Sequence, residues 1–141
     1  MPLTTHIDIV SAESEIFSGT AVMVFAPAEM GEVGIAARHA PMVTRLKPGE
    51  VRVETLEGEY QHISVSGGIL EVQPHKVTVL ADTATRAADI DEAAALQAKE
   101  RAEKAMQDKS AKMDYARAQA EFAEAAAQLK AIEAMRRRAK R

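Results

Sequence analysis

The sequence predicts an α+β protein in two parts, an N-terminal antiparallel β-sandwich over residues 1–86 and a C-terminal antiparallel two-helix hairpin over residues 87–141. All seven glycines and all five prolines lie at or before Pro74, so the rest of the chain lacks the strongest helix breakers. From Asp89 onwards, alanine makes up 17 of 53 residues, a composition typical of helices. Charge also divides the chain: residues 1–88 hold eleven acids and six bases (net −5), and residues 89–141 hold ten acids and twelve bases (net +2).

Short β-prone runs alternate with turn signals in the first part. The runs are rich in valine, isoleucine and threonine, and six of them are predicted to be strands: residues 5–10, 21–25, 51–55, 62–65, 69–72 and 77–80. Glycine and proline turns separate them at intervals of roughly eight to twelve residues, the spacing typical of a sandwich or barrel. No helical period interrupts these runs, which argues against a parallel βαβ sheet.

The second part follows the helical period instead. Asp89 is predicted to cap the first helix, with Glu92 three residues later completing a capping box. Small residues form a stripe along this helix: Ala95, Ala98, Ala102 and Ala105. The polar residues 107–112 are predicted to turn the chain into a second helix over about residues 114–138.

The second helix carries two apolar faces. One is a coiled-coil-like seam that includes the larger side chains: Tyr115, Ala118, Phe122, Ala125, Leu129 and Ile132. The other is an alanine stripe, which we expect to meet the alanines of the first helix: Ala116, Ala120, Ala123, Ala127 and Ala131. Burying a large apolar side chain gains roughly 1.5–3 kcal/mol and a methyl group far less, so the hairpin should be marginal alone and able to open.

Composition excludes several classes of function. There is no cysteine, hence no disulfide framework, thiolate metal site or cysteine nucleophile. A net charge of −3 and 4% aromatic residues give nucleic acid neither a basic field nor a stacking surface. The N-terminus does not have the pattern of a cleaved signal, and no run of eighteen apolar residues is present. We therefore expect no nucleic-acid partner and no membrane-spanning segment.

No motif predicts catalysis, a cofactor or a metal. The four histidines are widely spaced and form no His-x-x-x-His pair. Ser66-Gly67-Gly68 has serine at position 64 where a nucleophile elbow needs glycine, so it is interpreted as a turn. The segment 31–34 is too short for a dinucleotide fingerprint.

The last residues form a strongly basic end: Arg136, Arg137, Arg138, Lys140 and Arg141. Cations favour the C-terminus of a helix through its dipole, and this alone could account for some of them. Five bases in six residues exceed what capping requires, so docking on an acidic partner surface is an equally supported hypothesis.

Several segments, in order and spacing, resemble the epsilon subunit of bacterial F-type rotary ATP synthases. They are Asp8-Ile-Val-Ser-Ala-Glu13, Phe17-Ser-Gly19, Gly31-Glu-Val-Gly-Ile35, His39-Ala-Pro41, Ser66-Gly-Gly-Ile-Leu-Glu-Val-Gln-Pro74 and Val77-Thr-Val-Leu-Ala-Asp-Thr83, followed by the alanine-rich tail. The resemblance covers nearly the whole chain.

This resemblance implies a non-catalytic central-stalk subunit at the cytoplasmic face of the bacterial inner membrane, associated with the membrane only through the complex. The β-sandwich would bind the gamma subunit and the c-ring and so couple ring rotation to the catalytic head. The corresponding contact residues here are Gly31, Glu32, Gly34 and His39. The hairpin would insert into the alpha/beta head and inhibit ATP hydrolysis, with Arg136, Arg137 and Arg138 meeting acidic beta-subunit loops.

The chain also departs from the pattern of this family. Members that bind ATP on the hairpin have an arginine and an alanine where this chain has Ala94 and Ala95, after Ile90 and Asp91. The resemblance aligns further basic positions with Glu124 and Gln128, so we expect weak or absent nucleotide binding. Ala37-Arg38 replaces the usual Pro-Gly before His39, which makes the shape of that turn uncertain. Two alternatives remain open: a small ATP-sensing module, and a β-domain with a coiled-coil adaptor that has no enzyme partner.

Overall fold

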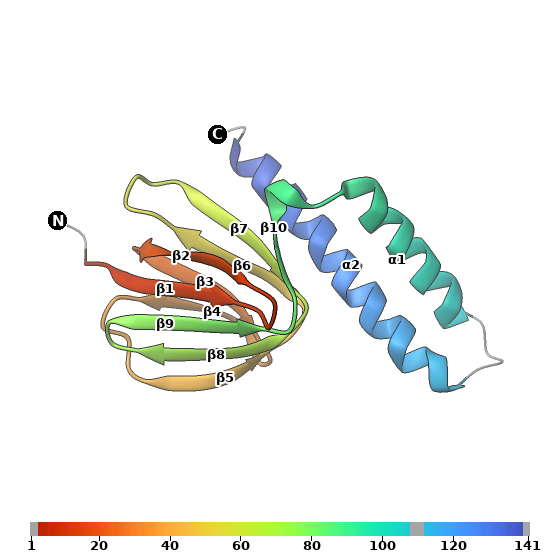
Figure 1. Ribbon diagram of the computed structural model, residues 1–141, viewed down its shortest axis with the longest axis horizontal. Helices are drawn as coiled ribbons and strands as arrows, with labels where there is room; N and C mark the ends of the chain where they lie inside the picture. Colours follow the sequence, from red (N-terminus) through yellow and green to blue (C-terminus); the bar gives the residue numbers. More distant parts are fainter. Residues whose placement is uncertain (1–2, 108–111, 140–141) are drawn as a thin grey trace.

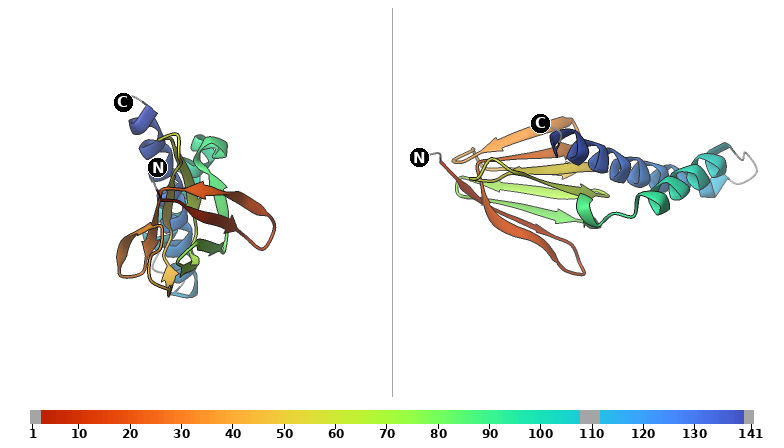
Figure 2. Two further views of the ribbon diagram at one scale, coloured as in Figure 1. Left: turned by 90° about the vertical axis from the view of Figure 1, so that its left-hand side faces the viewer. Right: turned by 90° about the horizontal axis from the view of Figure 1, so that it is seen from above.

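The computed structural model describes residues 3–107 and 112–139, which form a β-domain and a helical hairpin (Figure 1). The β-domain contains ten strands: β1 (Thr5–Val10), β2 (Glu15–Ala21), β3 (Met23–Ala28), β4 (Gly31–Ala36), β5 (Met42–Leu46), β6 (Gly49–Glu54), β7 (Tyr60–Val65), β8 (Gly68–Gln73), β9 (Lys76–Ala81) and β10 (Ala84–Arg86). A 3₁₀ turn, η1 (Ala87–Asp89), leads into α1 (Glu92–Gln107) and α2 (Lys112–Ala139). Figure 2 shows the hairpin extending beyond one end of the β-domain.

The strands form two layers around one core. The order β10-β7-β6-β3-β5-β8-β9-β1-β2, with β4 added to β3, changes layer between β3 and β5, where one residue pair, Ala28 and Leu46, connects them. At the other end Arg86 of β10 donates to the carbonyl oxygen of Ile16 in β2 through Nε (3.1 Å) and Nη2 (2.7 Å). The predicted sandwich is confirmed, and this contact brings it close to a closed barrel.

The predicted strands could be recognised in the sequence because their side chains alternate between the core and the surface. In β1, Ile7 and Ile9 are fully buried while His6 is exposed, and in β9, Val77 and Val79 are fully buried. Period-two alternation places one set of side chains in the core and the other outside. The core cluster consists entirely of β-domain residues, so this domain has a hydrophobic core of its own.

Three features of the β-domain differ from the prediction. The sequence did not indicate β2, β4, β5 and β10, which are short or largely half-exposed and therefore carry a weak hydrophobic pattern. The run predicted over residues 21–25 lies instead at 23–28, as β3. The sandwich is also not purely antiparallel, because β1 and β9 run parallel with Ile7 opposite Val77.

The first helix begins later than predicted and has a different cap. Asp89 belongs to η1, and Asp91 accepts a hydrogen bond from the backbone N–H of Ala94 at 3.1 Å through Oδ1. Asp91 is therefore the N-cap of α1, and Glu92 is its first residue. The predicted turn over residues 107–112 falls largely on 108–111, which lie outside the described residues.

The two faces of α2 contact the opposite partners from those predicted. The seam faces α1: Phe122 lies under the Lys99 ammonium at 5.6 Å, and Ala125 borders a groove with Ala98 of α1. The alanine stripe faces the β-domain, where Ala123 and Ala127 border a groove with β3 and β6. Helical periodicity marks both faces of α2 as apolar, but it does not assign a partner to either of them.

Gly68 tests the close approach of β8 to β9. Its φ is +142°, and a Cβ there would lie 2.1 Å from the carbonyl oxygen of Leu80. We expect Gly68→Ala to lower the free energy of unfolding by about 2–4 kcal/mol, measured by urea denaturation. Gly31→Ala is the matched control, because Gly31 has a φ of +132° but nothing within 4 Å of its Cβ position. Equal losses in the two variants would contradict a steric role for Gly68.

Candidate functional site

Glu32 lies just after the exposed turn that joins β3 to β4. Met30 is 97% exposed at this turn, and Gly31 opens β4 with a positive φ. The Glu32 carboxylate accepts a hydrogen bond from Arg52 of β6 through Oε1 at 2.9 Å. The Arg52 guanidinium also lies 4.7 Å from the centre of the Phe25 ring. Glu32 is thus oriented by an ion pair, while its side chain remains 54% exposed for a partner.

The structure does not bring His39 close to Glu32. His39 follows the far end of β4, and the strand spans roughly 13 Å from Glu32 to Ala36 at about 3.3 Å per residue. Arg38, the residue before it, adopts a left-handed conformation with φ +63° and donates its N–H to the carbonyl of Pro74 at 2.7 Å. Arg38 therefore adopts the conformation that glycine adopts most easily, and its backbone bond to the β8–β9 turn fixes the His39 loop.

Beneath α2, strands β6 and β7 present what we term the polar face: Glu50, Arg52, His62 and Ser64. Glu50 pairs in register with Ser64 and Arg52 with His62, on the side opposite the core residues of both strands. His62 Nδ1 lies 3.4 Å from Glu50 Oε1 without forming a hydrogen bond. In the described part of the chain, Glu50 Oε2, Arg52 Nε and His62 Nδ1 are buried without a hydrogen-bond partner.

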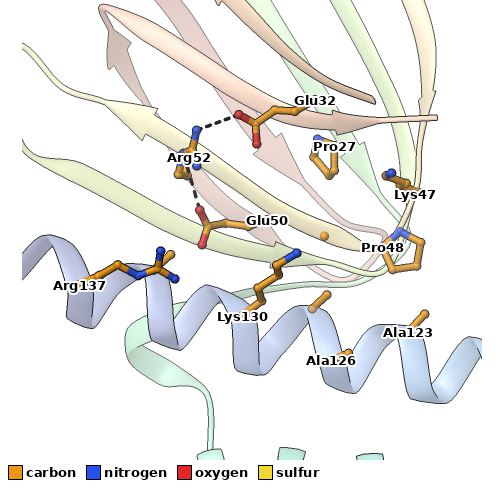
Figure 3. Close-up of a pocket in the computed structure, with 13 residues that line it drawn as sticks. Pro27, Glu32, Lys47, Pro48, Glu50, Arg52, Ala123, Ala126, Lys130 and Arg137 are labelled. Carbon is orange, nitrogen blue, oxygen red and sulfur yellow. Dashed lines mark hydrogen bonds and ion pairs between the residues drawn. The ribbon is translucent and has the colours of Figure 1, made fainter. Parts of the chain in front are cut away.

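A groove of about 520 Å³ lies between α2 and the part of this face formed by Glu50 and Arg52 (Figure 3). Pro27, Pro48 and Gly49 lie on the β-domain side of the groove, and four alanines of α2 lie on the other: Ala123, Ala126, Ala127 and Ala134. Figure 3 shows Lys130 and Arg137 projecting from α2 on the side where Glu50 lies. The part of α2 that borders this groove offers alanine methyl groups, Lys130 and Arg137, and no large apolar side chain.

The three described arginines of the basic end have partners within the chain. Arg136 donates to both carboxylate oxygens of Glu92 in α1, at 3.1 and 2.5 Å. Arg137 pairs with Glu133 of its own helix at 3.2 Å. The Arg138 guanidinium lies 3.9 Å from the centre of the Tyr60 ring in β7. Lys140 and Arg141 lie outside the described residues. The sequence indicated the arginines as candidate contact residues. It did not indicate Glu92 and Tyr60 as their partners, because no local pattern connects these positions.

The degenerate nucleotide motif has a structural role in the hairpin. Asp91 caps α1 through the N–H of Ala94, Ile90 donates its N–H to the carbonyl of Ala87, and Ala95 is buried. The groove between the helices is bordered by one arginine and two carboxylates: Arg101, Glu121 and Glu124, with Ala98, Ala105, Ala125 and Gln128. The Glu124 carboxylate accepts a hydrogen bond from Thr83 at 3.2 Å. This distribution of charge is unfavourable for a triphosphate.

A polar cluster on β1 and β2 has no arrangement for catalysis. Asp8 Oδ1 accepts from Ser18 Oγ at 2.7 Å and contacts His6 Nε2 at 2.8 Å. The Ser18 hydrogen bond, followed by the contacts with His6, holds the pKa of Asp8 below its usual value of 3.8 despite partial desolvation. Serine and aspartate approach the same imidazole nitrogen, so the proton relay of a hydrolase triad is not formed. Within the described ranges no three metal-ligating side chains gather, and no helix is long and apolar enough to cross a membrane.

Comparison with known proteins assigns the family. The model of the ATP synthase delta/epsilon chain β-sandwich domain matches residues 4–87, and that of the delta/epsilon chain long alpha-helix domain matches residues 88–133. The chain belongs to the ATP synthase epsilon-chain family. The ATP synthase epsilon chain of Nitrosococcus oceani is 70% identical over 138 residues, covering 98% of this chain and 99% of the relative. That of Alkalilimnicola ehrlichii is 62% identical with the same coverage.

Solved structures agree on the fold. A chain of the Euglena gracilis mitochondrial ATP synthase (OSCP/F1/c-ring) superimposes with a TM-score of 0.80 at 20% identity, covering 95% of this chain and 82% of that chain. A chain of the Tetrahymena thermophila mitochondrial ATP synthase central stalk/c-ring gives 0.60 at 12% identity, covering 92% and 97%. The epsilon-chain architecture of sandwich and helices is therefore found in this chain, a subunit of a larger enzyme.

The side chains of the two helices allow a prediction of whether this epsilon chain binds ATP. We expect calorimetric titration of the full chain with ATP to show no saturation in the millimolar range, because Ala94 and Gln128 offer no charged donor to phosphate. A variant carrying Ala94→Arg and Gln128→Arg should give measurable binding heat. Saturation of the native chain would contradict the prediction.

Proposed function

We propose that this epsilon chain is a non-catalytic central-stalk subunit that couples c-ring rotation to the catalytic head and inhibits ATP hydrolysis through its hairpin. Its partners are then the gamma subunit and the c-ring for the β-domain, and the alpha/beta head for α1 and α2. The proposal places it peripherally at the cytoplasmic face of the bacterial inner membrane. Its support is the family, the titles of the structural neighbours and the surfaces described below.

An uncovered apolar surface supports stalk binding by the β-domain. Val43, Ile69 and Leu80 are 71%, 43% and 46% exposed on the neighbouring strands β5, β8 and β9. The main contacts of α2 with the sandwich are on β6 and β7, in the other layer. Exposed apolar side chains gathered on one rigid sheet face are typical of a protein interface. We assign this face to gamma, and the exposed β3–β4 turn with Gly31, Glu32 and Gly34 to the c-ring.

The proposed inhibition by the hairpin rests on the polar side chains that lie beneath α2. A permanent interface is typically apolar, like a domain core cut in half. Here α2 packs on the strands that carry the polar face, and three atoms of this face are buried without a hydrogen-bond partner among the described residues, although Arg52 Nε and His62 Nδ1 lie 3.7 and 3.4 Å from Glu50 Oε1. Burying unpaired polar atoms costs free energy, and release of α2 would return them to water. The hairpin is therefore suited to leave the β-domain, and the core of that domain does not depend on it.

Binding to gamma separates this proposal from the adaptor alternative. We expect residues 1–86 to bind purified gamma, since the β-domain has its own core and retains the apolar face. Val43→Asp should weaken this binding at least tenfold by placing a charge in a desolvated contact, measured by surface plasmon resonance. Leu56→Asp is the matched control, because Leu56 is 52% exposed in the turn between β6 and β7. Absence of gamma binding would refute the stalk assignment.

Hydrolysis by the assembled complex tests inhibition. We expect a complex with a chain ending at Arg86 to hydrolyse ATP severalfold faster than one with the full chain, because the truncated chain lacks both helices. Coupled-enzyme assays at equal complex concentration measure this ratio. Retention of the truncated chain in the complex is verified by gel filtration. Equal rates would show that the hairpin does not inhibit.

A further inference from the structure

We propose that Glu92 and Tyr60 form a latch that keeps the hairpin docked by holding Arg136 and Arg138, so that docking and inhibition compete for the same arginines. This inference rests on the proposed function, since it specifies how the regulatory hairpin is retained. The latch consists of four residues: Tyr60 of β7, Glu92 of α1, and Arg136 and Arg138 of α2.

The first half of the latch closes the hairpin. Arg136 and Glu92 are 44 residues apart and join the last turn of α2 to the first residue of α1 by two hydrogen bonds. A two-pronged guanidinium–carboxylate pair has a defined geometry and is stronger than a single contact. The hydrogen bond with Glu92 raises the pKa of Arg136 above its usual value. This pair ties the two helices together at the end opposite their connection.

The second half attaches the hairpin to the β-domain. The Arg138 guanidinium lies over the Tyr60 ring at 3.9 Å, well within the range of a cation–π contact. Tyr60 is the first residue of β7, and its ring also lies 6.4 Å from that of His62 in the polar face. Arg138 thus supplies a directional contact between α2 and the β-domain, in addition to the hydrogen bond from Thr83 to Glu124.

Arg137 provides an internal comparison. Its carboxylate partner, Glu133, lies one turn away on the same helix, so this pair moves with α2 whether or not the hairpin is docked. By contrast, the contacts of Arg136 and Arg138 must break when α2 leaves α1 and β7. In the docked position both guanidinium groups lie against partners within the chain, so α2 has to leave Glu92 and Tyr60 before it can carry them to an acidic loop of another subunit. Each arginine therefore changes partner as the hairpin opens.

Distance measurements on the complete chain test the latch directly. The chain has no cysteine, so a label pair can be introduced at the exposed positions Glu57 and Glu121 without background. Glu92→Gln and Tyr60→Leu should raise the ratio of open to docked molecules roughly two- to fivefold, the range expected for exposed ion pairs and cation–π contacts. Tyr60→Phe, which retains the ring, and Glu133→Gln, which removes only the same-helix pair, should leave it unchanged. Unchanged label distances in Glu92→Gln and Tyr60→Leu would overturn the latch.

Hydrolysis by the assembled complex tests the competition. Glu92→Gln and Tyr60→Leu free an arginine and should lower the rate of ATP hydrolysis. Arg136→Ala and Arg138→Ala open the hairpin equally but remove the side chain that binds the head, so they should not lower it. If both classes shift the labels and have the same effect on hydrolysis, the competition is refuted. If the labels shift while truncation at Arg86 leaves hydrolysis unchanged, the latch stands and the inhibitory function fails.

Discussion

The packing of α2 on β6 and β7 determines how the hairpin is held against the β-domain. Alanine side chains allow the helix to approach the strands closely, but they bury little apolar surface. The strands in turn offer Glu50 and His62 where a stable interface would offer apolar side chains. The β-domain is therefore stabilised by the core between its two layers and not by the hairpin.

Much of the fold could be predicted because alternation in strands and periodicity in helices are local signals. The strands that were missed lack them: β4 contains two glycines and only Ile35 is buried, and β10 is three residues long. The parallel pairing of β1 with β9 depends on contacts about 70 residues apart, which no local pattern encodes. The cap at Asp91 was missed because the acids at positions 89 and 91 are equally good caps in sequence.

The candidate site was predictable as a set of residues but not as a set of contacts. Basic residues concentrated at the end of a helix indicated a charged function, and the structure adds the partners that engage them. Tyr60 and Arg138 lie in different parts of the fold, and their contact depends on the direction in which α2 crosses β7. That direction follows from which apolar face of α2 is turned to the sandwich, and helical periodicity assigns no partner to either face.

The parallel pair of β1 and β9 also sets an order of assembly. The first strand to leave the ribosome lacks this neighbour until residues 76–81 have been synthesised, so the second layer cannot be completed before nearly the whole β-domain has emerged. The surface that receives α2, formed by β6 and β7, is synthesised earlier. The hairpin is therefore synthesised after the strands on which it docks, and the folding of the β-domain does not have to wait for it.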